Sequence, residues 1–410
     1  DDEDRPRMYR PSLGVVFDVD QSTGRSALDN APVFAGRAGM HIRGNSTASY
    51  PKKQYSFETW DETDEDLDVA LLGFPAESDW VLQAPFADKT LMRNHLMYAW
   101  SNRIGRYASR TKFIELYLNK DGGVLTEDTY VGVYVLMEKV KRDANRVNVE
   151  SLDSDDKTAP AVTGGYILEK GWNFSEEVGI RTQRLGDELL FIYPKADSIT
   201  SEQRAYLQGY LDDFEDALMG SEFTDPELGY EKYIDVDSFI DHHLMVEMAR
   251  NIDGYVLSTF VHKPRGGKLT MGPIWDYNGA LGNPDYFEGW FTEGWHYENP
   301  EFPADNPNAY HWYERLMEDP AFRSRYTARW RQLRASHFEL IGLYQDIDSA
   351  ADLLGEAAIR NFERWDILGD YVWPNAPGFQ GRDSYQKEID YMKDWLEQRL
   401  LWMDAELERP

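Results

Sequence analysis

Residues 236–250 carry apolar side chains at helical spacing, and the chain after them reads as a hairpin. The apolar positions are Val236, Phe239, Ile240, Leu244 and Met248. We expect Gly254 to close this helix in the left-handed conformation. Two β-prone runs follow, Tyr255–Lys263 and Lys268–Trp275, and the Pro-Arg-Gly-Gly run between them is typical of a turn.

The remaining apolar pattern divides the chain after Ala196. Before it, short alternating runs predict strands, at Leu13–Asp18, Ala38–Arg43, Lys52–Phe57, a hairpin of Thr111–Asn119 with Thr129–Val140, and a strand after Gly164. After it, helical periods prevail, in residues 201–218 with Ser201 as the N-cap, 311–317, 322–338, 347–364 and 385–407. We expect the tryptophans of this tail to lie in the core, namely Trp330, Trp365, Trp395 and Trp402. The pattern predicts an α+β protein with a β-rich lobe (1–196) and a helical lobe (197–410).

The predicted hairpin brings two acids to one end. If Lys263 faces Lys268, Asp276 lies opposite Tyr255, two positions from Asp253. At about 3.3 Å per strand residue, the two carboxylates lie within about 10 Å of each other. Together with Asn278 they can hold a divalent cation through oxygen ligands, and one of them can orient or deprotonate a hydroxyl. The alternative is that both acids only form turns or caps.

Composition narrows the possible partners. The 410 residues carry a net charge of −30 and contain no cysteine. Such a surface repels nucleic acid and anionic membranes, and the lack of cysteine excludes disulfides, thiol nucleophiles and cysteine-bound zinc. No apolar run approaches the roughly 20 residues that a membrane helix needs. The first ten residues do not form a signal peptide, so we expect a mature or trimmed chain.

Several motifs together resemble the CotH family of spore-coat-protein-H-like atypical kinases, over roughly residues 42–401. The central ones are Asn251-x-Asp253-Gly254-Tyr255 with Ser258-Thr259-Phe260, and Gly272-Pro273-x-Trp275-Asp276-x-Asn278 with Gly282-Asn283. Further similar stretches are Arg43-Gly44-Asn45-Ser46-Thr47, Asp88 with Arg93-Asn94, the 129–140 strand, and Gly164-Gly165-Tyr166-Ile167-Leu168-Glu169.

The resemblance implies a two-lobed, protein-kinase-like fold and an ATP-dependent phosphotransferase. In that function Asp253 would orient or deprotonate the acceptor hydroxyl, and Asp276 would hold Mg²⁺ or Mn²⁺ with help from Asn278. Ser258 stands where a typical kinase catalytic loop has an Asn that binds the second metal ion. Serine is a weaker metal ligand than Asn. The implied acceptor is a serine or threonine of a secreted or cell-surface protein.

The first lobe supplies the candidate nucleotide ligands. Lys53 is the better lysine for reaching the phosphates, with Arg43 and Asn45 nearby; the alternative is that Lys52 and Lys53 are ordinary strand-edge lysines. Glu138 either pairs with Lys53, lines the nucleotide edge, or forms a salt bridge at the end of the sheet. Glu169 has a weaker claim on the site.

Other residues are more easily explained by structure. The spacing of Leu91, Leu96, Ala99 and Trp100 predicts an amphipathic helix, and we expect Arg93 to lock it to the sheet rather than to position a phosphate. His242, His243 and His296 show no metal-ligand spacing, so we expect them to be structural or surface residues. The long aromatic segment Pro284–Tyr310 is either a lid or a substrate platform. Its Trp290 and Trp295 either stack on a base or sugar or plug the core.

Function classes other than protein phosphorylation stay open. Abundant Trp, Tyr and acids are also typical of secreted carbohydrate-active or carbohydrate-binding proteins. A kinase-like fold can also transfer AMP or attach glutamate, or be a pseudokinase without transfer activity.

Overall fold

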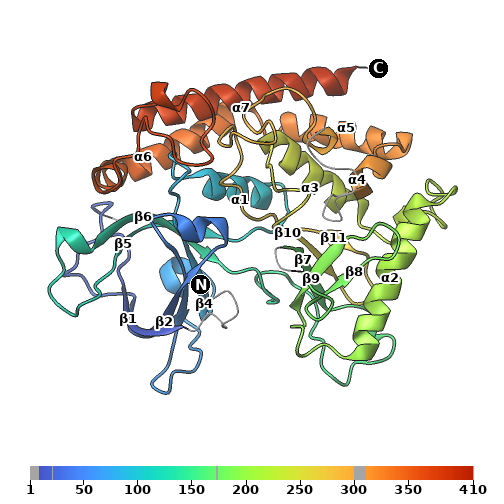
Figure 1. The fold of residues 1–410 in the computed structure, drawn as a ribbon, viewed down its shortest axis with the longest axis horizontal. Helices are drawn as coiled ribbons and strands as arrows, with labels where there is room; N and C mark the ends of the chain where they lie inside the picture. Colours follow the sequence, from blue (N-terminus) through green and yellow to red (C-terminus); the bar gives the residue numbers. More distant parts are fainter. Residues whose placement is uncertain (1–8, 21, 172–173, 300–310, 410) are drawn as a thin grey trace. The chain divides into compact units, whose positions relative to one another are not determined.

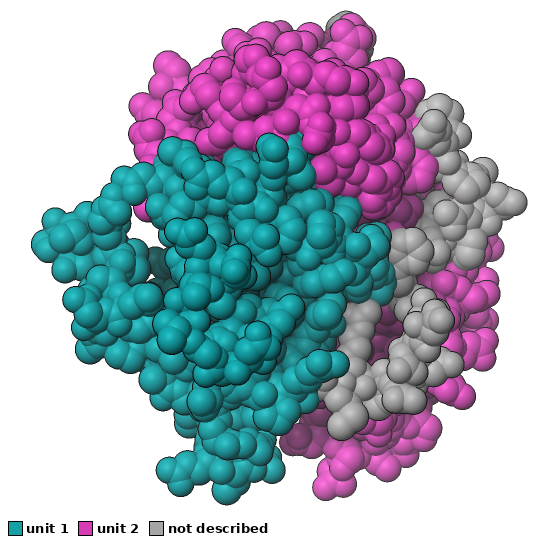
Figure 2. Space-filling model, turned by 60° about the vertical axis from the view of Figure 1, so that its left-hand side comes forward, with its two compact units in different colours: residues 1–91, 109–139, 354–367 teal, residues 92–108, 140–353, 368–410 magenta. Residues whose placement is uncertain are grey.

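The computed structural model describes residues 9–20, 22–171, 174–299 and 311–409 (Figure 1). The chain forms two compact units, coloured separately in Figure 2. Unit 1 contains residues 1–91, 109–139 and 354–367, and unit 2 contains residues 92–108, 140–353 and 368–410. The expected division after Ala196 differs from this one, because residues 140–196 pack within unit 2 and residues 354–367 within unit 1.

Unit 1 is built on a six-stranded antiparallel sheet in the order β1-β2-β3-β4-β6-β5. Its strands are β1 Arg10–Val16, β2 Phe34–Arg43, β3 Gln54–Thr59, β4 Asp79–Gln83, β5 Thr111–Tyr117 and β6 Tyr130–Glu138. Alternation of apolar and polar residues predicted most of these strands, and the β5–β6 hairpin is confirmed. The core of the unit gathers buried aromatic and aliphatic side chains, including Phe34, Phe57, Trp80, Tyr134 and Leu136.

Unit 2 contains a second antiparallel sheet, in the order β11-β10-β7-β9-β8. Its strands are β7 Tyr166–Lys170, β8 Gly179–Arg181, β9 Glu188–Tyr193, β10 Thr259–Lys263 and β11 Thr270–Met271. The pattern predicted β7 and the hairpin region but not β8 or β9. A small cluster of Val140, Val147, Val149, Ile167 and Phe260 fills the space beside this sheet.

The α-helices of the described residues lie in unit 2, apart from the end of α6 (Figure 1). They are α1 Arg93–Arg103, α2 Ser201–Met219, α3 Val236–Ala249, α4 His311–Leu316, α5 Pro320–Arg334, α6 Leu340–Arg364 and α7 Tyr385–Glu408, with the last part of α6 in unit 1. The strand-rich first part and the helical second part confirm the α+β class. Thr200, not Ser201, caps α2, because its side chain accepts from the backbone of Gln203.

Among the tail tryptophans, Trp330 and Trp395 are buried as expected. Trp365 and Trp402 are only partly buried. Of the helices in the part of the chain that the structure describes, none combines the length and apolar character required to span a bilayer.

Helix α3 begins and ends for identifiable reasons. Asp235 caps its start by accepting from Ser238, and Arg250 ends it in the left-handed conformation with φ 46°. The expected closing role of Gly254 is therefore wrong. Gly254 is needed for another reason, since a Cβ there would lie 2.7 Å from Val246 on the helix. The glycine lets the turn that carries Asp253 pack directly on α3.

Candidate active site

The hairpin exists, but it is shorter and shifted by one residue from the expected pairing. Val261 pairs with Met271 and His262 with Thr270, so the predicted pairing of Lys263 with Lys268 is wrong. The strands end at Thr259 and Met271. Asp253 therefore lies on a turn, and Asp276 in an irregular segment, beyond the ladder rather than at strand ends.

Loop contacts, not strand pairing, bring the two acid-bearing segments together. The amide of Asn251 donates to the carbonyl of Asp276 at 3.5 Å. The backbone of Leu281 donates to Ala249 at 2.7 Å, at the end of α3. The segment after Asp276 thus runs beside the segment before Asp253, and both acids lie in unit 2.

Asp253 is partly exposed, while most of its neighbours on the turn are buried. No described residue forms a hydrogen bond with its carboxylate. Burial first, and then the nearby charge of Asp276, raise the pKa of Asp253 to about 7. Two carboxylates that repel each other in this way favour either a shared proton or a bound cation.

Helix α1 holds the Asp276 segment in place. The Asp276 backbone donates to the Tyr98 hydroxyl at 3.0 Å, and the Tyr277 backbone donates to the Asn94 side chain at 2.6 Å. Arg93 is fully buried and donates to the carbonyls of Ala280 and Leu281. The structural role expected for Arg93 is confirmed, although these contacts anchor the loop that carries Asp276 and not the sheet.

Sequence reasoning missed the roles of Asn94 and Tyr98. Asn94 follows Arg93 in one of the family-like stretches named above, so the sequence did point to this residue. Tyr98 is 178 residues from its partner Asp276, and no motif in the sequence pointed to it.

Strained backbone is concentrated at this site. Nine described residues other than glycine have positive φ, and six of them fall between residues 250 and 288. They are Arg250, Ser258, Asp276, Leu281, Phe287 and Glu288. Such conformations persist only where surrounding contacts impose them, and they gather at functional sites. The strain at Asp276 and Ser258 therefore supports a functional origin for both turns.

The oxygen donors around the acids suit a hard divalent cation. Asn278 lies two residues after Asp276, and Ser258 five residues after Asp253; both are partly exposed. Mg²⁺ typically takes one or two carboxylates and completes its shell with water and phosphate oxygens. No cluster of three or more His, Cys, Asp or Glu suited to a metal occurs in the described residues. Carboxylate, amide and hydroxyl oxygens are the donor types that such an ion takes, so the residues present are chemically suited to the expected Mg²⁺ or Mn²⁺.

The candidate phosphate ligands lie in unit 1, where the two neighbouring lysines differ sharply. Lys52 is buried and donates to the Val133 carbonyl at 2.6 Å and to Asn361 at 2.8 Å. Burial lowers its pKa to about 7. Lys53 is partly exposed and donates to the Ala48 carbonyl at 2.7 Å. Lys52 is therefore a structural residue, and Lys53 is the lysine that keeps access to solvent.

Arg43 and Asn45 flank the turn that follows β2. Arg43 is the last residue of the strand and is partly buried, and Asn45 is exposed just before a short 3₁₀ helix, Ser46–Ser49. Ala48, the partner of Lys53, belongs to this short helix. The structure thus joins the turn and Lys53 in one local arrangement within unit 1.

Glu138 forms the salt bridge that was one of its three expected roles. It is fully buried at the end of β6 and accepts from the Arg110 side chain at 2.6 Å and from the Arg110 backbone at 2.9 Å. The contacts of Glu138 with Arg110 join the end of β6 to the residue that precedes β5.

The histidines are structural, as expected. His242 and His243 are buried and contact the hydroxyls of Tyr313 and Tyr326. His296 is buried and contacts the carbonyl of Ile252 at 3.1 Å. Burial lowers the pKa of all three below the ordinary value.

The aromatic segment after Asn283 is described up to Asn299, and residues 300–310 lie outside the described residues. Trp290 accepts at its carbonyl from the buried Trp395 ring at 2.9 Å. Trp295 packs edge-on against Trp402 with ring centres 5.0 Å apart. Both Trp290 and Trp295 remain partly exposed.

Comparison with known proteins gives one result. The family model described as CotH kinase protein matches residues 40–403, nearly the whole chain. Among curated proteins no match is found.

Proposed function

Because the chain belongs to the CotH kinase protein family, we propose that it transfers the γ-phosphoryl group of ATP to a serine or threonine hydroxyl of a protein. One observation carries the proposal. A partly exposed carboxylate, Asp253, has no hydrogen bond from the described residues, and burial together with the charge of Asp276 raises its pKa. Such an acid pair suits a cation and a reacting hydroxyl.

Asp253 is the group that would receive the proton. A general base works best with a pKa near the working pH, and the pKa of Asp253 is about 7. As the acceptor oxygen bonds to the γ-phosphorus, the bond from that phosphorus to the ADP oxygen breaks and the hydroxyl proton passes to Asp253. In this family of reactions the protein mainly positions the reactants and stabilises their charge.

Asp276, with Asn278 and Ser258, would hold Mg²⁺ or Mn²⁺. When bound, such an ion neutralises charge on the nucleotide phosphates. The contacts with Tyr98 and Asn94 fix the Asp276 turn before any ligand arrives, so little reorganisation is needed.

Lys53, Arg43 and Asn45 would contact the phosphates, and the Glu138–Arg110 pair would stabilise the sheet of unit 1. Lys52 is left out because its ammonium group is buried against Val133 and Asn361. We further propose that the acceptor is a secreted or cell-surface protein, and that the aromatic segment after Asn283 contacts it.

Labelled ATP provides the test. The chain is incubated with Mg²⁺ or Mn²⁺, a serine-rich acceptor protein, and ATP labelled at either the γ- or the α-phosphate. Transfer of γ-label, lost in Asp253→Asn and Asp276→Ala, supports phosphorylation. Transfer of α-label instead shows AMP transfer. Incorporation of labelled glutamate shows glutamate attachment, and no transfer from any label by wild type contradicts the proposal.

Carbohydrate binding is the second candidate, and one cavity favours it. An open cavity of about 500 Å³ in unit 2 is lined by Trp290, Phe291, Tyr391 and Trp395, with the carboxylates of Glu293 and Asp394. Aromatic faces beside polar groups suit sugar rings. If oligosaccharides raise the melting temperature and Mg- or Mn-nucleotides do not, carbohydrate binding replaces phosphorylation as the main function.

A further inference from the structure

Beneath the turn that carries Asp253, helix α3 contains a fully buried carboxylate, Glu247. One of its oxygens accepts from the Tyr255 hydroxyl at 2.8 Å and the Tyr297 backbone at 2.9 Å. The other accepts from the His296 backbone at 2.7 Å and the Arg399 side chain at 3.0 Å. Three of these four partners can only donate, namely the backbones of Tyr297 and His296 and the Arg399 side chain, while the Tyr255 hydroxyl can also accept. Because each oxygen faces at least one obligate donor, the site requires an acceptor on both oxygens.

Two buried arginines extend this network into the loop after the active site. Arg399 of α7 donates to the carbonyls of Glu247, Thr292 and Gly294. Arg250 donates to the carbonyls of Glu288, Glu293 and Gly294. The end of α3, the loop of residues 288–297 and α7 are therefore tied together through charged groups that water does not reach.

This network holds the chain on both sides of Asp253. On one side His296 contacts the carbonyl of Ile252 at 3.1 Å. On the other side Tyr255, bound to Glu247, lies two residues beyond Asp253 in the same turn. The turn is closed by backbone bonds from Val256 and Leu257 to the Asp253 carbonyl. Glu247 is thus linked, through Tyr255 and His296, to the chain on both sides of Asp253.

We propose that Glu247 is a positioning residue for Asp253: it accepts from Tyr255, His296, Tyr297 and Arg399 and so fixes the turn that carries the proposed base. The inference rests on the proposed function. Glu247 does not touch the reacting atoms; it acts through the Tyr255 ring and the loop at His296. Where a reaction depends on the positioning of its groups, a displacement of about 1 Å can cost roughly a hundredfold in rate.

The diagnostic substitution is Glu247→Gln, which keeps the shape but replaces one acceptor oxygen with a donor. In either orientation the new NH₂ group faces at least one obligate donor, the Tyr297 backbone on one side or the His296 backbone and Arg399 on the other, so at least one of the four hydrogen bonds is lost. We expect kcat to fall at least tenfold, while KM for ATP and the affinity for Mn²⁺ change less than about twofold, because the Asp276 turn is held by α1. Tyr255→Phe, which removes only one donor, should lower kcat by a smaller factor and serves if Glu247→Gln does not fold.

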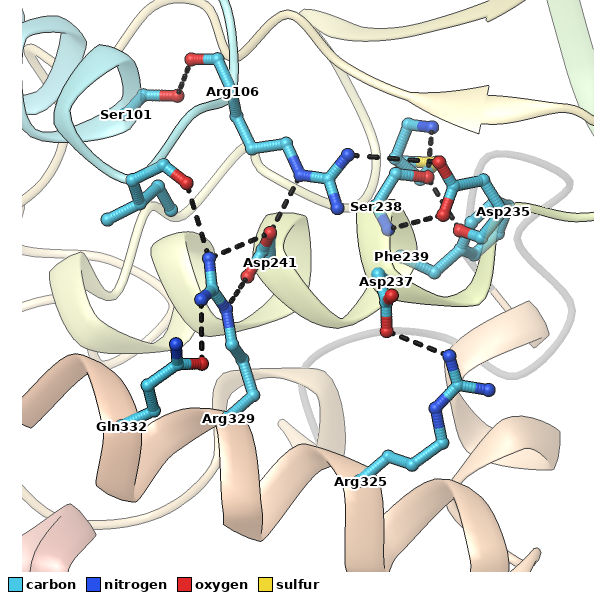
Figure 3. Close-up of polar contacts among 12 residues, drawn as sticks. Ser101, Arg106, Asp235, Asp237, Ser238, Phe239, Asp241, Arg325, Arg329 and Gln332 are labelled. Atoms are coloured by element: carbon cyan, nitrogen blue, oxygen red, sulfur yellow. Dashed lines mark hydrogen bonds and ion pairs between the residues drawn. The ribbon is translucent and has the colours of Figure 1, made fainter.

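Asp241 supplies a matched control on the same helix. It is a buried carboxylate between Arg106 and Arg329, each donating at 2.7 Å (Figure 3). These two arginines lie just after α1 and on α5, and neither belongs to the Asp253 turn. Asp241→Asn should therefore lower stability as Glu247→Gln does, and leave kcat within about twofold of wild type.

A second measurement keeps the inference testable even if no transfer occurs. The stability difference between wild type and Asp253→Asn, followed against pH, reports the environment of the Asp253 carboxylate and needs no activity. In the Glu247→Gln background this dependence should shift toward lower pH, because a loosened turn admits water. An unchanged dependence, or equal losses of kcat in Glu247→Gln and Asp241→Asn, would overturn the inference. Absence of transfer by wild type counts against the proposed function alone.

Discussion

Replacing Asp253 with asparagine should stabilise the metal-free protein at high pH, although it removes the proposed base. The carboxylate is partly buried beside Asp276 and has no hydrogen-bond donor among the described residues. Ionising it in the folded state is therefore unfavourable. Asparagine has the same shape and carries no charge, so this unfavourable term disappears.

The magnitude follows from the pKa of Asp253, which rises from 3.8 to about 7 on folding. Below pH 3.8 both states hold the proton and the group contributes nothing. Between the two values only the unfolded state releases it, so stability falls as pH rises, and the loss is complete above about pH 7. The full difference is about 4 kcal/mol at about 1.36 kcal/mol per pKa unit. Because the side chain retains contact with solvent, we expect about 1–3 kcal/mol to be measured.

The assay is chemical denaturation of wild type and Asp253→Asn at about pH 5 and about pH 8, with a chelator to remove divalent cations. The asparagine variant should be the more stable at both values, by a larger margin at the higher pH. Glu115→Gln is a control of opposite sign. Burial raises the pKa of Glu115, but its hydrogen bonds with Arg360 and Tyr130 outweigh this and lower it, so this variant should lose stability at the higher pH. Equal stability of Asp253→Asn and wild type at the higher pH would refute the reasoning.

Four further tests separate the roles of individual residues. Asp276→Ala should abolish the thermal stabilisation by Mn-ATP, which for wild type amounts to about 2.7 kcal/mol at a hundredfold excess over Kd. Tyr98→Phe removes the acceptor for the Asp276 backbone; denaturation should show a loss of about 1 kcal/mol and transfer assays a roughly tenfold lower kcat. Lys53→Ala should raise KM for ATP about tenfold with little change in stability, whereas Lys52→Ala should destabilise unit 1 by about 2–4 kcal/mol, as measured by denaturation, because it strands buried acceptors. Gly254→Ala should destabilise the protein by about 1–3 kcal/mol through a clash with a valine of α3, and no loss in denaturation would contradict the close approach.

Local patterns were enough to predict most elements. Helix α3 was expected at Val236–Arg250 and spans Val236–Ala249, because a continuous apolar face leaves few alternatives. Strands β8 and β9 were not predicted. The three residues of β8, Gly179–Arg181, are too few to show a strand pattern. The closure of α3 was misplaced because Arg250 takes the left-handed conformation that sequence reasoning reserved for glycine.

The site was harder to predict, since it depends on contacts between distant segments. Asp253 and Asp276 do interact electrostatically, but the expected route through the β-ladder was wrong by one residue. Contacts of the loops with each other and with α1 bring the two acid-bearing segments together. A contact such as that of Tyr98 with Asp276 cannot be predicted from the local sequence pattern. Lys52 and Lys53 look alike in sequence, and only the packing of unit 1 distinguishes the buried from the accessible lysine.

The central claim is that Asp253 and Asp276 form one site for a divalent cation and a nucleotide. A titration of Mn²⁺ followed by electron paramagnetic resonance, with a non-hydrolysable ATP analogue present, tests it most directly. Wild type and Asp253→Asn should bind Mn²⁺ with saturation, and Asp276→Ala should not. Saturating binding by Asp276→Ala equal to that of wild type would contradict the claim.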